Sequence, residues 1–266
     1  MNSISAVGVR PGDQDVVGYE MNIVHPDLVP APDLDRQAML DIQAQVRDIA
    51  CLRDDRVAAD LEADTIVGGV DQAFRSDEVV SAVVCLQGGT VVDDAVATVP
   101  IDLPYLPGLL AFREAGGILA AVTSLSTGID VLLCDGNGRL HPRGAGLATH
   151  VGVVLDIPTV GIAKSLLCGT FDGPEPPYPP GTSVPIRADD GVELPFGSLL
   201  GYAIQTKQWD SPDRHINPLY VSPGHRVSPE TAVSIVQATV DGYKLPEPIR
   251  LADRLAEVAA TDRSSR

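Results

Sequence analysis

Three acidic residues of the sequence, Asp71, Glu114 and Asp135, have the types and positions that a metal site requires. Asp71 interrupts the apolar run TIVGGVDQAF (65–74), and Asp135 ends the run IDVLLCD (129–135). A carboxylate on a buried strand is costly unless it is paired or bound to a metal ion. If the two strands are neighbours, their carboxylates form a hard oxygen site that suits magnesium, and Glu114 could supply a third oxygen. Spacing alone leaves the alternative open, in which these are turn residues and a solvated helix residue.

The loop DGNGRLHPRGAG (135–146) holds three kinds of group that can face a phosphate: His141, Arg143 and backbone amides beside glycines. Two other glycine motifs are excluded here. A calcium-binding helix–loop–helix requires Glu at the twelfth position, where Gly146 stands. A dinucleotide-binding fingerprint requires a third glycine where His141 stands. The loop therefore indicates a phosphate-facing segment.

Two further polar residues follow apolar segments. Lys164 ends the run PTVGIAK and could contact a phosphate or a leaving oxygen, or could simply extend its ammonium group into water. His225 in PGHRVS could orient a water molecule or line the metal site, or could cap or pack. The chain has no G-x-S-x-G elbow and no cysteine in a basic setting, so covalent catalysis has no candidate.

Tyr105 lies in PYLPG (104–108), between two prolines. Because proline fixes the backbone, the ring would be held rigidly and exposed. A rigid exposed ring suits stacking on bases or wedging between them. The alternative is an ordinary loop tyrosine.

The elements that must position these residues follow from the spacing of apolar side chains. Helices are predicted, in chain order, over 35–61, 109–125 with a break or kink at Gly116–Gly117, 147–155 and 228–240. Strands are predicted over 65–74, 79–87, 90–101, 129–135, 158–164 and 199–206. The first three strands are joined by short turns, which predicts an antiparallel meander. The proline-rich, acidic segment 172–195 predicts an exposed excursion.

A meander followed by helix–strand–helix–strand predicts an α/β fold, a ribonuclease H-like mixed central sheet with helices on both faces. We expect a flexible lead-in over residues 1–32, one catalytic domain over 33–253 and a C-terminal tail over 254–266.

The overall composition gives partly conflicting indications. The formal net charge of −17 argues against a nucleic-acid partner, because such binding usually depends on lysine and arginine. The segment 135–170, however, carries two acids and three bases, a local sum of +1, and a bound metal ion would add positive charge. The four cysteines form no C-x-x-C pair, no signal peptide or run of eighteen apolar residues occurs, and we expect a soluble, cytoplasmic protein.

Four stretches in this order resemble the endonuclease V family, and together they extend over roughly residues 35–253. They are GGVDQAF, PYLPGLLAFRE, LLCDGNGRLHPRGAGLATHVGVVLDIPTVGIAKSLLCG and INPLYVSPGHRVSPETAV, followed by GYKLPEPIRLAD. The resemblance implies a ribonuclease H-like fold and a cut in deoxyinosine-containing DNA that depends on Mg²⁺, for which Mn²⁺ can substitute. It implies cleavage at the second phosphodiester bond 3′ to the lesion, with 3′-hydroxyl and 5′-phosphate ends.

The resemblance also implies roles for particular residues. Asp71 and Asp135 match the metal-binding acids of the family, and Glu114 matches its third acid. Further active-site positions are matched by His141, Lys164 and His225. Residues implied to contact DNA are the wedge Tyr105, the pocket residues Leu106, Gly136 and Gly138, and Arg143. The chain departs from the family at Gln72, where an apolar residue is expected, at Gly144-Ala145, and in the length of 172–195.

The implied partner is DNA that contains deoxyinosine or other deaminated or mismatched bases. We expect the protein to bind it as a monomer and to have no membrane partner. Inosine-containing RNA is the nearest alternative substrate. A non-catalytic nucleic-acid or nucleotide-binding module is disfavoured, because binding alone does not need three acids on three elements. A magnesium-dependent phosphatase of small substrates fits the acidic balance but does not need Tyr105 between its prolines.

Overall fold

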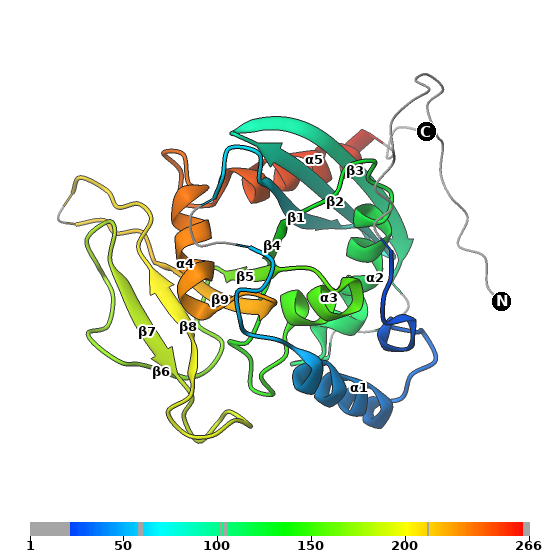
Figure 1. Cartoon of the computed structure of the whole chain (residues 1–266), viewed down its shortest axis with the longest axis horizontal. Helices are drawn as coiled ribbons and strands as arrows, with labels where there is room; N and C mark the ends of the chain where they lie inside the picture. Colours follow the sequence, from blue (N-terminus) through cyan, green and yellow to red (C-terminus); the bar gives the residue numbers. More distant parts are fainter. Residues whose placement is uncertain (1–21, 58–60, 102, 104–105, 212, 263–266) are drawn as a thin grey trace.

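A computed structural model describes residues 22–57, 61–101, 103, 106–211 and 213–262 of the chain. In this part of the chain, a nine-stranded mixed sheet has the order β3-β2-β1-β4-β5-β9-β8-β7-β6 (Figure 1). The strands are β1 (Ile66–Phe74), β2 (Glu78–Gln87), β3 (Thr90–Pro100), β4 (Val131–Asp135), β5 (Thr159–Ala163), β6 (Thr170–Phe171), β7 (Ser183–Arg187), β8 (Leu199–Ile204) and β9 (Leu219–His225).

The predicted meander is confirmed, since β1 pairs antiparallel with β2 and β2 with β3. β4 then lies parallel to β1, and β5 parallel to β4. Parallel neighbours need a crossover connection, and helices provide it in both cases. β9 returns antiparallel beside β5 and joins this part of the sheet to β8, β7 and β6.

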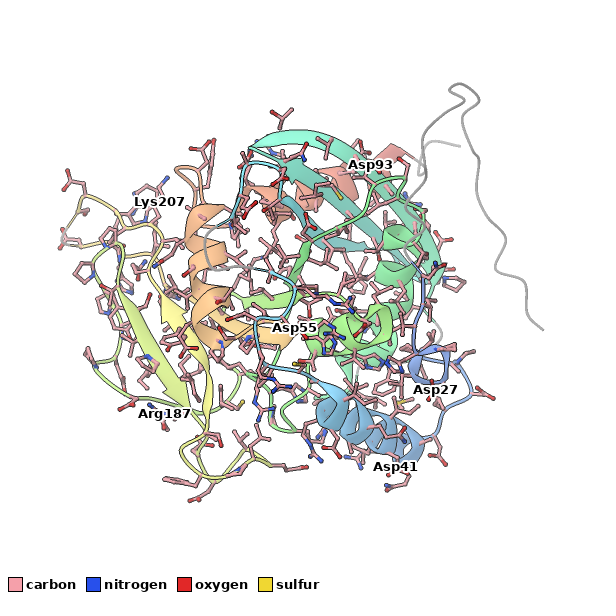
Figure 2. All side chains as sticks on the ribbon, viewed as in Figure 1. Asp27, Asp41, Asp55, Asp93, Arg187 and Lys207 are labelled. Atoms are coloured by element: carbon pink, nitrogen blue, oxygen red, sulfur yellow. The ribbon has the colours of Figure 1, made fainter. Side chains whose placement is uncertain are left out.

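The helices form two layers. They are the 3-10 helix η1 (Pro26–Leu28), α1 (Arg36–Ile49), α2 (Leu110–Val122), α3 (Leu147–Leu155), α4 (Pro229–Ala238) and α5 (Glu247–Asp262). Asp35 caps the N-terminus of α1, where its carboxylate accepts from the Ala38 amide, and Ser228 caps α4, where its hydroxyl accepts from the Thr231 amide. Charged side chains surround the molecule, such as Asp41 on α1 and Arg187 on β7, which lie far apart in Figure 2.

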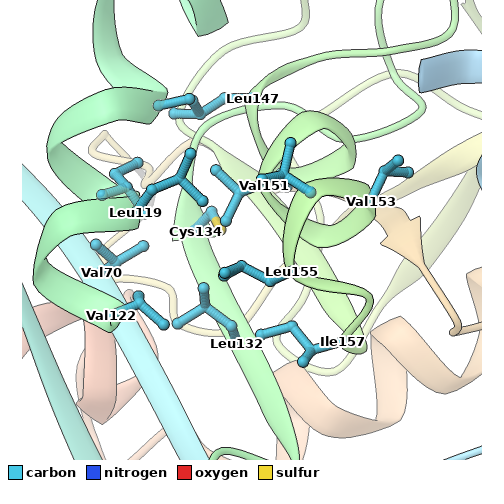
Figure 3. Packing of buried hydrophobic residues seen from close by; sticks show 14 of the residues in the cluster. Val70, Leu119, Val122, Leu132, Cys134, Leu147, Val151, Val153, Leu155 and Ile157 are labelled. Carbon is cyan, nitrogen blue, oxygen red and sulfur yellow. The ribbon is translucent and has the colours of Figure 1, made fainter. Parts of the chain in front are cut away.

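Each face of the sheet carries its own apolar core, because successive side chains of a strand point to opposite faces. On one face, Leu132 and Cys134 of β4 pack with α2 and α3 (Figure 3). On the other face, Val131 and Leu133 pack with α4 and α5. The predicted α/β fold, a ribonuclease H-like mixed sheet between helices, is confirmed.

The structure corrects three predictions about the elements. The helix predicted over 35–61 is α1, which ends at Ile49. α2 runs through Gly116 and Gly117 without a break, and Gly117 lies so close to Ser81 of β2 that a Cβ would overlap its hydroxyl. The segment 172–195 is not simply an exposed excursion, because it supplies β7 and buries Tyr178 and Val192 in a third core cluster. Its prolines and acids occupy the turns around that cluster.

Several elements were not expected from the sequence, among them β9 and α5. β9 forms within INPLYVSPGH, and α5 continues past the boundary drawn at residue 253 to Asp262. Among the described residues, no helix combines the length and apolar character needed to cross a membrane.

Candidate active site

The sheet places Asp71 and Asp135 side by side. Val70 of β1 pairs with Cys134 of β4 in the parallel register, and the two aspartates are the next residue on each strand. Both therefore lie at the carboxyl end of the parallel pair. They point to the face that α5 covers, where Gly69, two residues before Asp71, packs against the first turn of that helix.

Glu114 of α2 joins these two acids in one electrostatic cluster. Burial, and then the neighbouring charge of Asp135, raises the pKa of Asp71 to about 7. Burial also raises the pKa of Glu114 to about 7; Arg113 opposes the shift, and the charges of Asp135 and Asp71 add to it. Buried carboxylates that repel one another bind a cation readily, because a cation removes both penalties at once.

Lys164 supplies a cation to this cluster from the end of β5. Its Nζ lies 2.6 Å from Asp135 Oδ2 in an ion pair that is partly open to solvent. Burial alone would lower the pKa of Lys164, but the hydrogen bond to Asp135 and the charges of Asp135, Asp71 and Asp253 raise it. The lysine is therefore positively charged, beside the acids.

Asp253 of α5 is a member of the cluster that sequence reasoning missed. Its charge acts on both Asp71 and Lys164. The signal available in the sequence was its position at the end of the GYKLPEPIRLAD stretch, on the polar side of a periodic helix. The residue is far from Asp71 along the chain, and only the packing of α5 on β1 brings the two together.

The contacts of Gln72 explain why a polar residue stands where the family pattern predicts an apolar one. Its amide nitrogen Nε2 donates to Ser81 Oγ at 2.6 Å and to the main-chain oxygen of Glu114 at 3.1 Å. Its backbone N–H donates to Asp71 Oδ1 at 2.7 Å. A polar side chain at this position thus fastens α2, which carries Glu114, to the strand that carries Asp71.

The loop that follows Asp135 is held by neighbouring strands. The Gly136 amide donates to the Ile162 oxygen at 3.0 Å, and the Gly138 amide donates to Ser222 Oγ at 3.0 Å. Gly161 of β5 lies directly against this loop, where a Cβ would overlap the main chain of residues 136–138. The glycines therefore permit close backbone approach, and two of the amides have partners within the protein.

A second set of contacts ties this loop to the segment before α2. The carbonyl oxygen of Gly108 accepts from Gln43 Nε2 and from the Arg143 guanidinium, and the His141 ring also bonds to it. Gln43 in turn accepts from Arg143 and donates to the Ala145 oxygen at 2.7 Å. Three polar side chains thus converge on one carbonyl group.

His141 is a neutral, buried member of this set. Burial, and then the charge of Arg143, lowers its pKa to about 4, although the bond to Gly108 opposes the shift. Its Nδ1 accepts from the Arg143 amide at 3.1 Å, and its side chain has little contact with solvent. At neutral pH it orients the loop as a hydrogen-bonding ring and carries no charge.

The structure does not bring His225 to the acids. His225 pairs with Thr159, at the end of β5 opposite to Lys164. Its Nδ1 accepts from the Cys51 amide and its Nε2 contacts Asp156 Oδ1, each at 3.1 Å. It is buried in a structural network, and its candidate catalytic role finds no support in these contacts.

The predicted DNA-contacting residues differ in what the structure describes. Leu106 is half-buried and packs against the cluster formed by Met39, Leu109 and Phe112. Tyr105, the predicted wedge, lies outside the described residues.

The chemistry of the donor set fits a hard divalent cation. The facing groups are carboxylates, and Mg²⁺ is usually held by one or two of them together with water and substrate phosphate. Across the described part of the chain, no three His, Cys, Asp or Glu side chains form a complete set of ligands. The adjacent pair Asp71 and Asp135 matches the sparser arrangement that magnesium uses.

The raised pKa of Asp71 predicts how metal-free stability depends on pH. The folded chain keeps this proton up to about pH 7, whereas the unfolded chain releases it near the ordinary value of 3.8. The stability contributed by the protonated carboxyl is therefore present below about pH 4 and is lost as pH rises towards 7. In chelator, the melting temperature of Asp71→Asn, relative to that of the unmodified chain, should rise as pH increases from about 4 to about 7. Melting curves that shift in parallel at every pH would contradict the assignment.

Comparison with known proteins adds independent observations. A profile of the endonuclease V family matches residues 52–254. Endonuclease V of Haloarcula marismortui is 49% identical in an alignment of 261 residues, and the match covers 89% of this chain and 96% of that protein. The crystal structure of endonuclease V from Streptomyces avermitilis matches with a TM-score of 0.74 and 33% identity, over 90% of this chain and 97% of that one. Endonuclease V of Ciona intestinalis, solved in complex with a 24mer DNA containing an inosine followed by a ribo-adenosine, matches with a TM-score of 0.66 and 25% identity, over 86% of this chain and 99% of that one.

Proposed function

This chain belongs to the endonuclease V family, and from that premise we propose that it is a metal-dependent DNA repair endonuclease that recognises deoxyinosine. In this proposal it cuts the second phosphodiester bond 3′ to the lesion and leaves 3′-hydroxyl and 5′-phosphate ends. The observation that carries the proposal is the position of Asp71 and Asp135 on adjacent parallel strands, each directly after the last paired residue, with Glu114 and Lys164 in the same cluster.

Asp71 and Asp135 would hold the divalent cation, Mg²⁺ or in its place Mn²⁺, with Glu114 as the third acid. The cation would supply Lewis-acid stabilisation of the attacked phosphate and would lower the pKa of a bound water. Lys164 places its ammonium group at Asp135, where it would face the phosphate or the leaving oxygen. Asp253 of α5 would add a further negative charge to the acidic cluster.

The other side chains would position the substrate. His141 and Arg143 fix the loop after Asp135 against Gly108, so that both segments present one surface. We propose that Leu106 and Tyr105 contact the lesion, with Gly136 and Gly138 in the facing loop. A base extruded from the stack costs a few kcal/mol, and the cost is least at a mispaired position. The protein would therefore select deaminated or mismatched bases in part through their weak pairing.

Inosine-containing RNA remains the alternative substrate, which one feature of a relative favours. The Ciona protein was solved with DNA in which a ribo-adenosine follows the inosine. We further propose a monomer that acts in the cytoplasm, where its four cysteines, all free in the structure, would stay reduced.

The test is a panel of inosine substrates. Deoxyinosine DNA, inosine RNA and unmodified DNA are incubated with the chain in magnesium, manganese or chelator. We expect a single cut at the second phosphodiester bond 3′ to inosine with either metal, and no cleavage in chelator. A cut on unmodified DNA at the same rate, or cleavage that persists in chelator, would overturn the proposal. Faster cleavage of the RNA would select the alternative substrate.

A further inference from the structure

One face of α1 lines a basic groove that the catalytic cluster does not include. Arg36, Leu40, Ala44 and Arg47 follow one another at steps of four, four and three residues, which places them on one side of the helix. With Arg143 and Glu193 they line a hollow of about 230 Å³. We call this hollow the arginine groove.

The groove gathers positive charge in a chain whose net charge is −17. Burial lowers the pKa of Arg143, and the charge of Arg36 lowers it further, although Glu193 opposes the shift. Burial and the charge of Arg47 likewise lower the pKa of Arg139, which lies in the same loop as Arg143. Arg36 therefore repels Arg143 at the groove, and Arg47 repels Arg139 beside it.

Nearby acids compensate this repulsion only in part. Arg47 contacts Asp48 at 3.0 Å, and Asp48 is mostly exposed. Glu193 stands at the rim and is also exposed. An anion with several negative groups would relieve the repulsion, and guanidinium groups bind phosphate oxygens with two parallel hydrogen bonds.

The dimensions of the groove fit a run of phosphates. Arg36 and Arg47 are separated by about 16 Å along the helix axis, since eleven steps of about 1.5 Å lie between them. One strand of DNA places a charge at about every 3.4 Å of its axis. The arginine face therefore spans about four or five phosphates.

The groove is also connected to the catalytic cluster. Arg143 donates to the Gly108 oxygen and to Gln43 of α1, so α1 and the loop that follows Asp135 meet at this side chain. The loop that begins at Asp135 therefore connects the catalytic acids to α1 through Arg143.

We propose that the arginine groove binds the phosphodiester backbone of the substrate beyond the bond that is cut. The contact is independent of base sequence, and it supplies affinity that an acidic protein otherwise lacks. This inference rests on the proposed function, because it takes the same nucleic acid as the substrate.

The test removes two arginines that lie outside the catalytic cluster. Arg36→Gln/Arg47→Gln is compared with Arg187→Gln/Arg214→Gln, which removes the same charge from β7, where Arg187 lies (Figure 2), and from the loop between β8 and β9. Binding of fluorescent duplexes, with and without deoxyinosine, is measured in chelator at several salt concentrations at which circular dichroism shows every variant folded.

We expect the groove variant to bind both duplexes roughly tenfold more weakly, since each phosphate contact changes affinity several-fold over an ordinary salt range. The slope of log affinity against log salt should fall by about 2, at about 0.9 for each phosphate contact. The control variant should keep the slope of the unmodified chain. Equal losses in both variants, or an unchanged slope in the groove variant, would overturn the inference.

The two proposals fail in different ways. If the unmodified chain cuts deoxyinosine DNA and the groove variant binds DNA as tightly as the unmodified chain does, only the groove inference fails. If the unmodified chain binds plain DNA through these arginines but never cuts at inosine, only the proposed function fails. If the unmodified chain binds neither duplex, both proposals fail.

Discussion

Asp71→Asn and Asp135→Asn should each reduce the cleavage of deoxyinosine DNA by roughly 10³-fold or more, while the chain stays folded. The change replaces one oxygen and removes the charge, so a cation that depends on this pair loses affinity and its stabilisation of the transition state. Metal ions contribute several kcal/mol to such steps, and each 1.36 kcal/mol corresponds to tenfold in rate. Single-turnover cleavage at saturating magnesium measures the loss.

The folded state of the variants distinguishes loss of the metal site from loss of the protein structure. In Asp71→Asn the remaining side-chain oxygen can still accept from the Gln72 amide, and burying a neutral amide avoids the charge that burial now penalises. Asp94→Asn, on exposed β3, makes the same chemical change away from the cluster and should leave the rate unchanged. Cleavage retained by both cluster variants would exclude the pair as the metal site.

Gly161→Ala should destabilise the protein by roughly 3 kcal/mol or more and should also abolish cleavage. A Cβ at this position would overlap the main chain of residues 136–138. These are backbone atoms, which cannot move aside as the end of a flexible side chain can. Overpacking of a well-packed core typically costs about 1–3 kcal/mol, and a clash with backbone lies at or above the upper end. Urea unfolding monitored by circular dichroism gives the stability change.

Gly116→Ala is the matched control, because the same methyl group would meet nothing within 4 Å there. It lies in the interior of α2, where alanine is favoured over glycine by about 0.5–1 kcal/mol. The control should therefore be as stable as the unmodified chain or slightly more so. A Gly161→Ala chain of normal stability would show that the loop after Asp135 can move away from β5.

The central part of the fold was predictable because its signals are local. Alternating and continuous apolar runs with short turns determined the meander of β1, β2 and β3. The position of Asp71 and Asp135 in such runs then indicated that the two carboxylates could be neighbours, and the register of β1 with β4 places them so. These inferences needed no knowledge of distant contacts.

The remaining elements depend on contacts that a local pattern does not reveal. The helix α2 continues through its glycines, and Gly117 is needed there because a larger residue would overlap Ser81 of the sheet. The segment 172–195 contains many turn formers, yet its few apolar residues close a third core with β8. Such packing outweighs local turn propensity.

The candidate site shows the same division. Lys164 reaches Asp135 because the strands β4 and β5 are adjacent, which the order of elements already indicated. His225 stands at the other end of β5, and this depends on the direction in which β9 returns. Asp253 joins the cluster only through the packing of α5, a helix that was not predicted from the sequence and whose second half falls in the predicted C-terminal tail.

The two-layered origin of the acidic cluster has a consequence for folding kinetics. Glu114 belongs to the helix layer on one face of the sheet, whereas Asp253 belongs to the layer on the other face, and Asp71 and Asp135 lie on the sheet between them. Contacts between residues so distant in the chain form late, because closing long loops is entropically costly. A partly folded chain, such as one still emerging from synthesis, therefore lacks the assembled acids. Under the proposed function, the chain could cut DNA only once both layers have docked.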